Sequence, residues 1–222
     1  MLQDRSICVI GAGGHAKVLI GAMRAGGTEI ARAIDSGDPG PGDVLGVPVI
    51  GENVFLETFS PDDVTLLLGI GSTAGGSFRK EIFERFVASG YEFARLIHPS
   101  AMIDESVAFG SGAQIMAGAV LQPGIALGDN VIVNSGAVID HDCRIAAHVH
   151  VAPGAVISGD VHIAEGAHIG CGATIRQSIR IGAGSTVGAG AVVVKDVPAE
   201  TTVMGIPAVA ANSIPARQGT SS

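Results

Sequence analysis

Between residues 97 and 198, an aliphatic side chain returns at every sixth position. Cutting this segment from Ile97 gives seventeen hexads without an insertion, and each begins with Ile, Leu or Val, except for the one that begins with Phe109. The fifth residue of every hexad is small or aliphatic. A flexible tract rich in Gly and Ala would not keep this spacing, whereas a six-residue period is typical of a β-helix.

The fourth position of the hexads explains why the chain bends at this interval. It is Gly nine times, Asp or Asn four times, Ser three times and His148 once. Gly, Asn and Asp are the residues that tolerate a left-handed backbone. Three such bends close a triangle, so that coils of 18 residues stack about 4.8 Å apart, as neighbouring strands do. Each first-position aliphatic then points into a prism, where its burial stabilises by roughly 1.5–3 kcal/mol.

Residues 1–96 have a different pattern, in which short apolar runs alternate with helical spacing. The runs "SICVIGAGG", "EIARAID" and "VTLLLGIGS" are typical of buried strands, with a Pro/Gly-rich loop between the second and the third, and "YEFARLI" closes the unit. The segments "HAKVLIGAMRAGG" and "SFRKEIFERFVASG" have helical spacing, and the second places Ile82, Phe83, Phe86 and Val87 on one face. This order predicts a parallel sheet with right-handed crossovers.

The two patterns divide the chain. We expect an α/β parallel-sheet domain over residues 1–96, a parallel β-helix over residues 97–211 and a tail over residues 212–222.

Charge and composition argue against several kinds of partner and location. The net charge is −8 and Lys and Arg form no cluster, so no binding to nucleic acid is expected. No segment has 18 uninterrupted apolar residues, and the first residues are acidic and polar, so neither a membrane span nor a signal peptide is expected. Cys8, Cys143 and Cys171 are an odd number in dissimilar contexts, which favours reduced thiols in the cytoplasm over a disulfide framework.

Five stretches together carry a resemblance to one group of enzymes. They are "VIGAGGHAKVL", "LIHPSA", "VIDHDC", "HVHVAPGAVISGDVHI" and "VVKDVPAETTVMGIPA". In combination they resemble the hexapeptide-repeat acetyltransferases that include sialic acid O-acetyltransferases and the nucleotide-linked 4-amino-sugar N-acetyltransferases of bacillosamine and perosamine precursors. The resemblance covers about residues 5–209.

The resemblance implies a fold, an assembly and a reaction. It implies a left-handed parallel β-helix, which spacing alone does not, and a homotrimer with acetyl-CoA in a cleft between neighbouring subunits. The first domain would be a Rossmann-like holder of the nucleotide sugar. The reaction implied is N-acetylation of the 4-amino group of a nucleotide-linked 4-amino-4,6-dideoxyhexose, with GDP-perosamine favoured. O-acetylation of a sialic-acid-like sugar is the nearest alternative.

The resemblance also implies roles for single residues of the β-helix. The family's general base is the His of "HE" or "HD", here His141, and the acidic residue after it is Asp142, where several relatives have Glu. The contacts to the coenzyme correspond to His150, Cys171 and Ala189, and the last two lie 18 residues apart, so that they stack on one side of the prism.

The first domain offers candidate substrate contacts at the ends of its predicted strands. "GAGGHAK" follows a strand and opens a helix, where backbone N–H groups can bind phosphate, although Ala16 replaces the third Gly of a dinucleotide fingerprint. Asp35 ends the second strand, where an acidic side chain can accept from a ribose or a base. The other contacts implied by the resemblance are Gly13, Gly14, His15, Gly71 and Ser72. After "GIPA", where relatives often carry Lys or Arg, this chain has Val209, so no phosphate contact is expected there.

The chemistry of acetyl transfer to an amine fits the residues around position 141. The amine attacks a thioester and loses a proton, for which an imidazole with a pKa near the working pH is a suitable acceptor. His141 is the third residue of its hexad, at a corner where a side chain can leave the prism, and a carboxylate beside it can fix its tautomer. One coil further on is Gly159, whose N–H we expect to stabilise the oxyanion. No cysteine is placed as a nucleophile, so direct transfer is expected.

Other interpretations of the histidines remain open. "HDC" and "HVH" could suggest zinc, which γ-carbonic anhydrases with the same repeat bind through three histidines, but Cys143 falls on an inward fifth position, and no metal is expected. His162 and His168 occupy sixth positions and are expected to be surface residues, and His98 to be structural. A non-catalytic sugar-nucleotide sensor is a further alternative.

Overall fold

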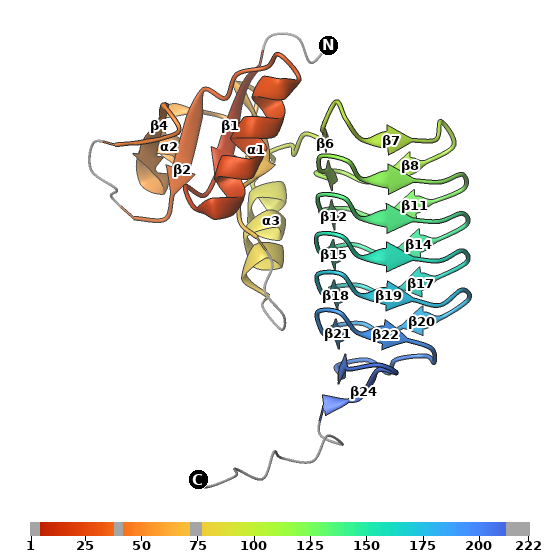
Figure 1. Ribbon diagram of the computed structural model, residues 1–222. Helices are drawn as coiled ribbons and strands as arrows, with labels where there is room; N and C mark the ends of the chain where they lie inside the picture. The colour runs from red at the N-terminus through yellow and green to blue at the C-terminus, as the bar shows by residue number, and fades with distance from the viewer. Residues whose placement is uncertain (1–4, 38–41, 72–76, 212–222) are drawn as a thin grey trace, which may run out of the picture.

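The computed structural model describes residues 5–37, 42–71 and 77–211. It confirms the expected fold class, an α/β domain with a parallel sheet followed by a left-handed parallel β-helix of hexapeptide repeats. Figure 1 shows the two parts side by side, with the α/β domain lying along one side of the stacked coils. No helix among the described residues is long and apolar enough to cross a membrane.

The first domain is a five-stranded sheet covered by helices. The strand order is β3-β4-β2-β1-β5, and all pairs are parallel except the β3–β4 hairpin. The strands are β1 (Ser6–Ile10), β2 (Arg32–Asp35), β3 (Asp43–Val44), β4 (Val47–Gly51) and β5 (Val64–Leu68), and the helices are α1 (Gly14–Ala25), α2 (Glu52–Thr58) and α3 (Phe78–Ala88).

Both faces of this sheet are buried, because successive strand residues point to opposite sides. Val9 of β1 packs with Leu19 of α1 in one apolar cluster. Cys8, its neighbour on β1, packs with Phe55 of α2 and Phe86 of α3 in the other. Continuous apolar runs are therefore the pattern that this sheet requires.

Two expectations for the first domain were wrong in detail. The Pro/Gly-rich segment expected to be a loop contains β3, β4 and α2, and the β3–β4 turn places Leu45 and Gly46 at φ angles of 50° and 77°. A bulky residue at such a φ is uncommon, so the sequence gives little sign of this hairpin. In α3, Val87 is exposed, and Arg79 joins Phe83 and Phe86 on the buried face.

The β-helix has three faces of stacked strands. Face 1 consists of β6 (Leu96–Ile97), β9 (Gln114–Ile115), β12 (Ile132–Val133), β15 (His150–Val151), β18 (His168–Ile169), β21 (Thr186–Val187), β23 (Thr202–Met204) and β24 (Val209–Ala210). Face 2 consists of β7 (Met102–Ile103), β10 (Val120–Leu121), β13 (Val138–Ile139), β16 (Val156–Ile157), β19 (Thr174–Ile175) and β22 (Val192–Val193). Face 3 consists of β8 (Ala108–Phe109), β11 (Ala126–Leu127), β14 (Arg144–Ile145), β17 (His162–Ile163) and β20 (Arg180–Ile181).

The chain visits face 1, face 2 and face 3 in turn, and we name each bend by the faces it joins, as the 1/2, 2/3 and 3/1 corners. First- and fifth-position side chains fill the prism with one continuous apolar core. Fourteen of the seventeen fourth positions have a positive φ, including His148 at 62°. The exceptions are Ser100, Ser106 and Asp196, and the first two accept a hydrogen bond through Oγ from the glycine N–H one coil further on.

The expected period fails at its last hexad. Val197 pairs with Ile181, and Thr202 pairs with Thr186, so these partners are 16 residues apart instead of 18. Here the Asp196 carboxylate accepts the Arg180 N–H at 2.9 Å, so a side chain takes a place that a backbone carbonyl takes in the regular coils. The seventeenth hexad is therefore two residues short.

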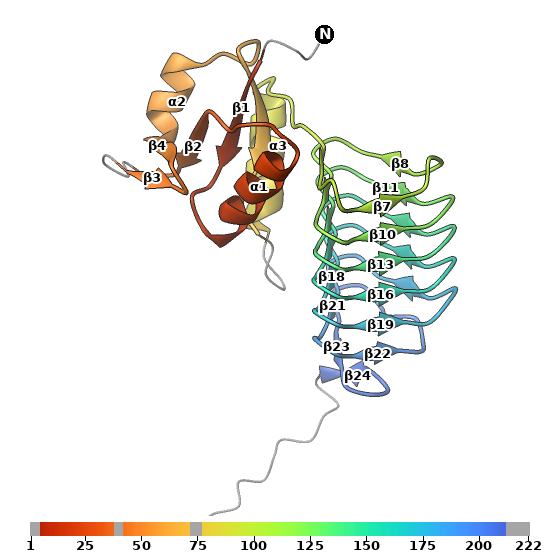
Figure 2. The same ribbon diagram turned by 45° about the horizontal axis from the view of Figure 1, so that its top comes forward.

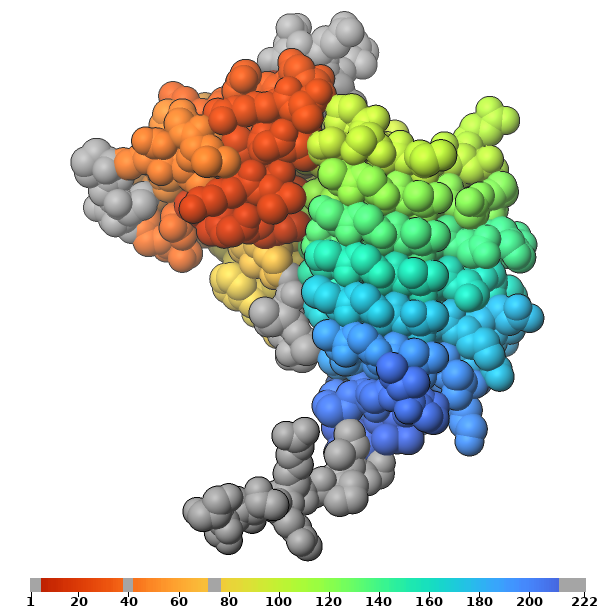
Figure 3. All heavy atoms as spheres, in the orientation of Figure 1, coloured from red at the N-terminus to blue at the C-terminus, as the bar shows by residue number. Residues whose placement is uncertain are grey.

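The first domain docks on face 1 and the 3/1 corner. Phe83 of α3 lies against Gly112, where an added Cβ would come within 2.9 Å of the ring, and it meets His148 edge-on at 5.7 Å. Lys80 pairs with Glu165 at the same corner. Figure 2 shows α1 and α3 beside the face 1 strands, and in the space-filling view of Figure 3 the last coils extend beyond the docked domain.

Candidate active site

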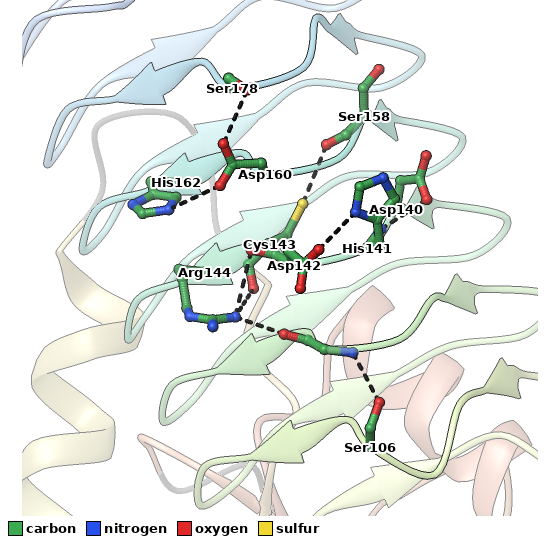
Figure 4. A network of polar contacts seen from close by, with 11 residues as sticks. Ser106, Asp140, His141, Asp142, Cys143, Arg144, Ser158, Asp160, His162 and Ser178 are labelled. Atoms are coloured by element: carbon green, nitrogen blue, oxygen red, sulfur yellow. Dashed lines mark hydrogen bonds and ion pairs between the residues drawn. The ribbon is translucent and has the colours of Figure 1, made fainter.

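The 2/3 corner carries an imidazole that is held by a carboxylate. His141 lies between β13 and β14, and its Nδ1 is 2.9 Å from Oδ2 of Asp142. Asp142 reaches this position from a left-handed backbone, with a φ of 60°. The backbone N–H of His141 donates to the carboxylate of Asp140 at 2.8 Å. Figure 4 shows this chain of contacts and the ring standing outside the prism, where its side chain is 58% exposed.

Electrostatics at this corner favour the protonated ring. The hydrogen bond with Asp142 is the largest cause that raises the pKa of His141, and the charge of Asp140 adds to it, with a small addition from Asp160. Because the Asp142 carboxylate can only accept, it fixes the proton of the neutral ring on Nδ1. Nε2 is then the atom left with a lone pair.

Gly159 lies beside the edge of the ring that carries Cε1 and Nε2. A Cβ on Gly159 would stand 2.6 Å from both Cε1 and Nε2 of His141, and the Asp160 N–H donates to the His141 carbonyl at 2.9 Å. The N–H of Gly159 donates no hydrogen bond to any residue that the structure describes. The corner therefore places a proton acceptor and an unused amide donor on adjacent coils.

None of the three cysteines presents its thiol beside the ring of His141. Cys143 points into the prism with its Sγ 3.3 Å from the Ser158 carbonyl, and burial raises the pKa of its thiol to about 11. Burial also raises the pKa of the Cys8 thiol to about 11. Cys171 is exposed, but at the 1/2 corner, away from His141.

A second site is a cavity of about 400 Å³ in the first domain. Five of the expected substrate contacts line it at the carboxyl ends of the parallel strands, namely Gly13, Gly14, His15, Asp35 and Gly71. Ser72, the remaining expected contact, lies outside the described residues. Glu52 of α2 also lines the cavity, and the sequence did not single it out because α2 itself was not expected.

Three more expected residues lie on face 1 and the 1/2 corner. His150 is buried on face 1, with Nε2 3.2 Å from Nδ2 of Asn134. The Asn134 oxygen accepts the Ser135 N–H, so the amide nitrogen must face His150. Cys171 and Ala189 are stacked one coil apart, and the Gly190 N–H donates to the Cys171 carbonyl at 2.8 Å.

Of the remaining histidines, His168 does not fit the sequence-based prediction. It is only partly exposed, lies edge-on to His150 at 5.0 Å, and has an Nδ1 that is buried without a partner among the described residues. It is therefore not a simple surface residue, because its ring packs against the buried His150 of the neighbouring coil. His162 is half-exposed beside Asp160, as expected, and His98 accepts from the N–H and Oγ of Ser100 within its own turn.

The two sites lie on opposite sides of one copy of the chain. In a three-sided prism the 2/3 corner is opposite face 1, and the cavity belongs to the domain docked on face 1. Figure 1 shows this domain beside β12, β15 and β18, with the bends that follow the face 2 strands at the far edge. A single copy thus brings together His141, Asp142 and Gly159, but not these residues and His15.

Two other features of the described residues bear on ligand binding. Among residues 5–37, 42–71 and 77–211 no three His, Cys, Asp or Glu side chains are grouped so that they could hold a metal ion. A larger hollow of about 720 Å³ runs along face 3, and it is lined by Arg144, His162 and Arg180 but not by His141. This hollow therefore does not contain the ring of His141.

Comparison with known proteins connects both parts to one kind of enzyme. Residues 6–86 match the family described as the PglD N-terminal domain, and residues 106–141 match the bacterial transferase hexapeptide (six repeats). The acetyltransferase domain of PglB from Neisseria gonorrhoeae FA1090, also solved in complex with acetyl coenzyme A, is 42% identical with a TM-score of 0.85, over 93% of this chain and 99% of that chain.

Two further relatives are similar. PerB from Caulobacter crescentus, solved in complex with CoA and GDP-perosamine, is 37% identical with a TM-score of 0.86, over 95% of this chain and 99% of that chain. GDP-perosamine N-acetyltransferase of the same organism has also been solved with one histidine replaced by alanine. The UDP-N-acetylbacillosamine N-acetyltransferase of Bacillus subtilis (strain 168) is 37% identical over 118 residues, which are 51% of this chain and 52% of that protein, so the match spans about half of its length.

Proposed function

The chain belongs to the hexapeptide-repeat nucleotide-sugar acetyltransferases with a PglD N-terminal domain, and from this premise we propose that it acetylates the 4-amino group of a nucleotide-linked 4-amino-4,6-dideoxyhexose. Acetyl-CoA is the acetyl donor. GDP-perosamine is the favoured acceptor, because the PerB relative was solved with it. The single observation that carries the proposal is the 2/3 corner, where Nε2 of His141 lies against Gly159 and Nδ1 is held by Asp142.

In the proposed mechanism His141 is the general base. The neutral amine of the sugar attacks the thioester carbon, and Nε2 of His141 takes the proton that the nitrogen loses as the C–N bond forms. Asp142 holds the ring and stabilises the imidazolium. The Gly159 N–H donates to the thioester oxygen while it carries negative charge. The C–S bond then breaks, the sulfur takes the proton from His141, and the amide and free CoA leave without an acetyl-enzyme.

The positions of the two sites support a homotrimer. Residues 1–96 would hold the nucleotide sugar and residues 97–211 the coenzyme, but the cavity and His141 face opposite ways in one copy. A neighbouring copy that presents its 2/3 corner to the cavity would complete the site. Cys171 and Ala189 are the proposed backbone contacts of the extended pantetheine arm, because they are stacked along one corner, and His150 is the proposed side-chain contact.

The most direct test is the release of CoA thiol from acetyl-CoA with a panel of acceptors. The panel contains GDP-, UDP- and dTDP-linked 4-amino sugars and, as a control, a sialic-acid-like sugar that offers hydroxyl groups alone. We expect thiol release with an amino sugar, fastest with GDP-perosamine, and none without an acceptor. Transfer to the hydroxyl sugar alone, or no transfer at all, would contradict the proposal.

The pH dependence of the reaction tests the pairing of His141 with Asp142. A general base works only when it is neutral, so kcat/KM should rise with pH, and its midpoint should lie above the 6.5 of an ordinary imidazole because Asp142 and Asp140 raise the pKa of His141. Asp142→Asn removes the largest cause. Its midpoint should therefore move to lower pH, and its plateau should fall because the ring is no longer oriented.

The matched control for this profile is Asp160→Asn, since Asp160 is the smallest of the acidic contributions to the pKa of His141. It should leave the midpoint almost unchanged. If the two variants moved the midpoint equally, the contact between His141 and Asp142 would not set the pKa of the base.

A further inference from the structure

Gln114 connects the β-helix to the cavity of the first domain. It lies on β9 of face 1 and is fully buried, although its side chain points out of the prism. Its Nε2 donates to the Leu68 carbonyl at 2.9 Å, and its Oε1 is 2.8 Å from Nε2 of His15. Both partners belong to the docked domain, so one side-chain amide of the β-helix bridges the imidazole of His15 and the carbonyl of Leu68 beside the cavity.

These two contacts fix where the proton of His15 lies. A backbone carbonyl can only accept, so the amide atom beside Leu68 must be nitrogen. The amide atom beside His15 is then oxygen, which also can only accept. Nε2 of His15 must therefore carry the hydrogen, and Nδ1 of the neutral ring has a lone pair.

The surroundings keep this ring neutral. Burial is the largest cause and lowers the pKa of His15 to about 4. The hydrogen bond with Gln114 raises this pKa, and the charge of Arg79 lowers it. Arg79 is itself 4% exposed and donates to the carbonyls of Leu68 and Ile70. Among the described residues that line the cavity, the other ionisable groups are the carboxylates of Asp35 and Glu52, from β2 and α2.

The second nitrogen of His15 is open to the cavity. Nδ1 makes no hydrogen bond to a described residue and is not one of the buried polar atoms without a partner, and His15 lines the cavity. Together with the carboxylates of Asp35 and Glu52, it lines the cavity with hydrogen-bond acceptors. A lone pair repels the oxygens of a phosphate and attracts an O–H or N–H donor.

We propose that Gln114 is a positioning residue for the nucleotide-sugar cavity, which holds His15 as the Nε2–H tautomer so that Nδ1 accepts a hydrogen bond from a hydroxyl or N–H group of the ligand. This inference rests on the proposed function for the identity of the ligand, but the tautomer is a property of the free protein. In this arrangement the phosphates of the ligand bind the backbone N–H groups at the start of α1, and a hydroxyl or N–H group of the ligand donates to His15.

The first experiment measures the tautomer without any substrate. Long-range ¹H–¹⁵N correlation spectra of protein labelled at histidine should show His15 with a protonated Nε2 and a bare Nδ1, and the Gln114→Leu variant should lose this preference. A protonated Nδ1 in the unaltered protein would overturn the inference. If no sugar of the panel is acetylated, the proposed function fails, while this measurement still decides the assignment of His15.

The second experiment separates positioning from docking of the two domains. Gln114→Leu should raise KM for the nucleotide sugar by about 5–30-fold, the usual cost of one lost hydrogen bond with a buried partner left unpaired, with kcat and KM for acetyl-CoA changed by less than about threefold. Gln114→Glu keeps an acceptor beside His15 and should restore binding at neutral pH. Its carboxylate would favour the imidazolium, so its KM should rise as the pH falls, at a higher pH than in the unaltered protein.

The control is Lys80→Ala, which removes another contact between the same two domains without touching His15. It should leave KM for the nucleotide sugar unchanged. If Lys80→Ala raised this KM as much as Gln114→Leu did, or if Gln114→Leu changed both substrates alike, Gln114 would serve docking alone and the inference would be wrong.

Discussion

Replacing His141 with asparagine should lower kcat by about 10²–10⁴-fold, the range that removal of a general base usually costs. Asparagine keeps a polar side chain of similar reach but cannot take a proton from the attacking amine. The ring is exposed and belongs to no apolar cluster, so the thermal unfolding midpoint should not change. Steady-state kinetics with the best acceptor of the panel measure the effect, and KM for both substrates should stay within about threefold.

A complementation experiment tests where the partner of His141 lies. Chains with His141→Asn are mixed with chains that carry Asp35→Ala in the cavity, and the two are unfolded and refolded together. If each site is built from two copies, some interfaces in the mixture will contain an intact cavity and an intact base, and activity will return. Mixtures as inactive as the separate variants would place His141 and the cavity in different reactions. Undiminished transfer by His141→Asn alone would exclude His141 as the base.

Gly159→Ala should lower kcat by about 10²-fold, because displacing a catalytic group by about 1 Å can cost that much. The added Cβ would stand 2.6 Å from Cε1 and Nε2 of His141, so the ring must move. The backbone itself does not require glycine here, since Gly159 lacks a positive φ and Ala117, Ala147 and Ala183 occupy the same hexad position in other coils. KM for acetyl-CoA should also rise, because the methyl group occupies the approach to the proposed amide donor.

Two controls isolate the contact between the ring and the new methyl group. Gln177→Ala, at the same corner one coil further on, should leave activity unchanged. The pair Gly159→Ala with His141→Ala should be as stable as His141→Ala alone, because the clash is gone, and a double-mutant cycle of unfolding free energies measures this coupling. Full activity of Gly159→Ala would show that the ring does not work from the position against Gly159.

The sequence predicts the β-helix well because each position in a hexad has one geometric role. Each bend needs a residue that tolerates a left-handed backbone, and the interior needs aliphatic side chains, so both kinds of residue recur at every sixth position. Fourteen of the fourth positions have the expected positive φ. The stacking of Gly159 on His141 follows from the same count, since they are one coil of 18 residues apart. This part of the candidate site could therefore be located before the structure was known.

The rest of the fold and of the candidate site depends on contacts between residues that lie far apart in the sequence, which a local pattern does not predict. The sixth-position side chain of Gln114 points outward, and it is fully buried because the first domain docks on it through Leu68 and His15. The sixth-position His168 is partly buried, edge-on to His150 of the neighbouring coil. The β3–β4 hairpin depends on Leu45 in a conformation that its side chain disfavours. The contacts of Gln114 cannot be predicted for the same reason, because its partners His15 and Leu68 lie in another domain.

The regular pairing of the coils limits how a chain of this kind can change its length. Between β6 and β22 every paired residue has its partner 18 positions away, and the first departure comes at Asp196, beyond the corner that carries His141. One residue inserted into a strand before this corner would move His141 to the fourth position of its hexad and Asp142 to the fifth, so that the carboxylate would point toward the apolar interior of the prism. Insertions and deletions are therefore compatible with the fold only as whole coils or as loops bulging from a bend, and the chain itself departs from the 18-residue spacing only in its last coil, where the partners are 16 residues apart.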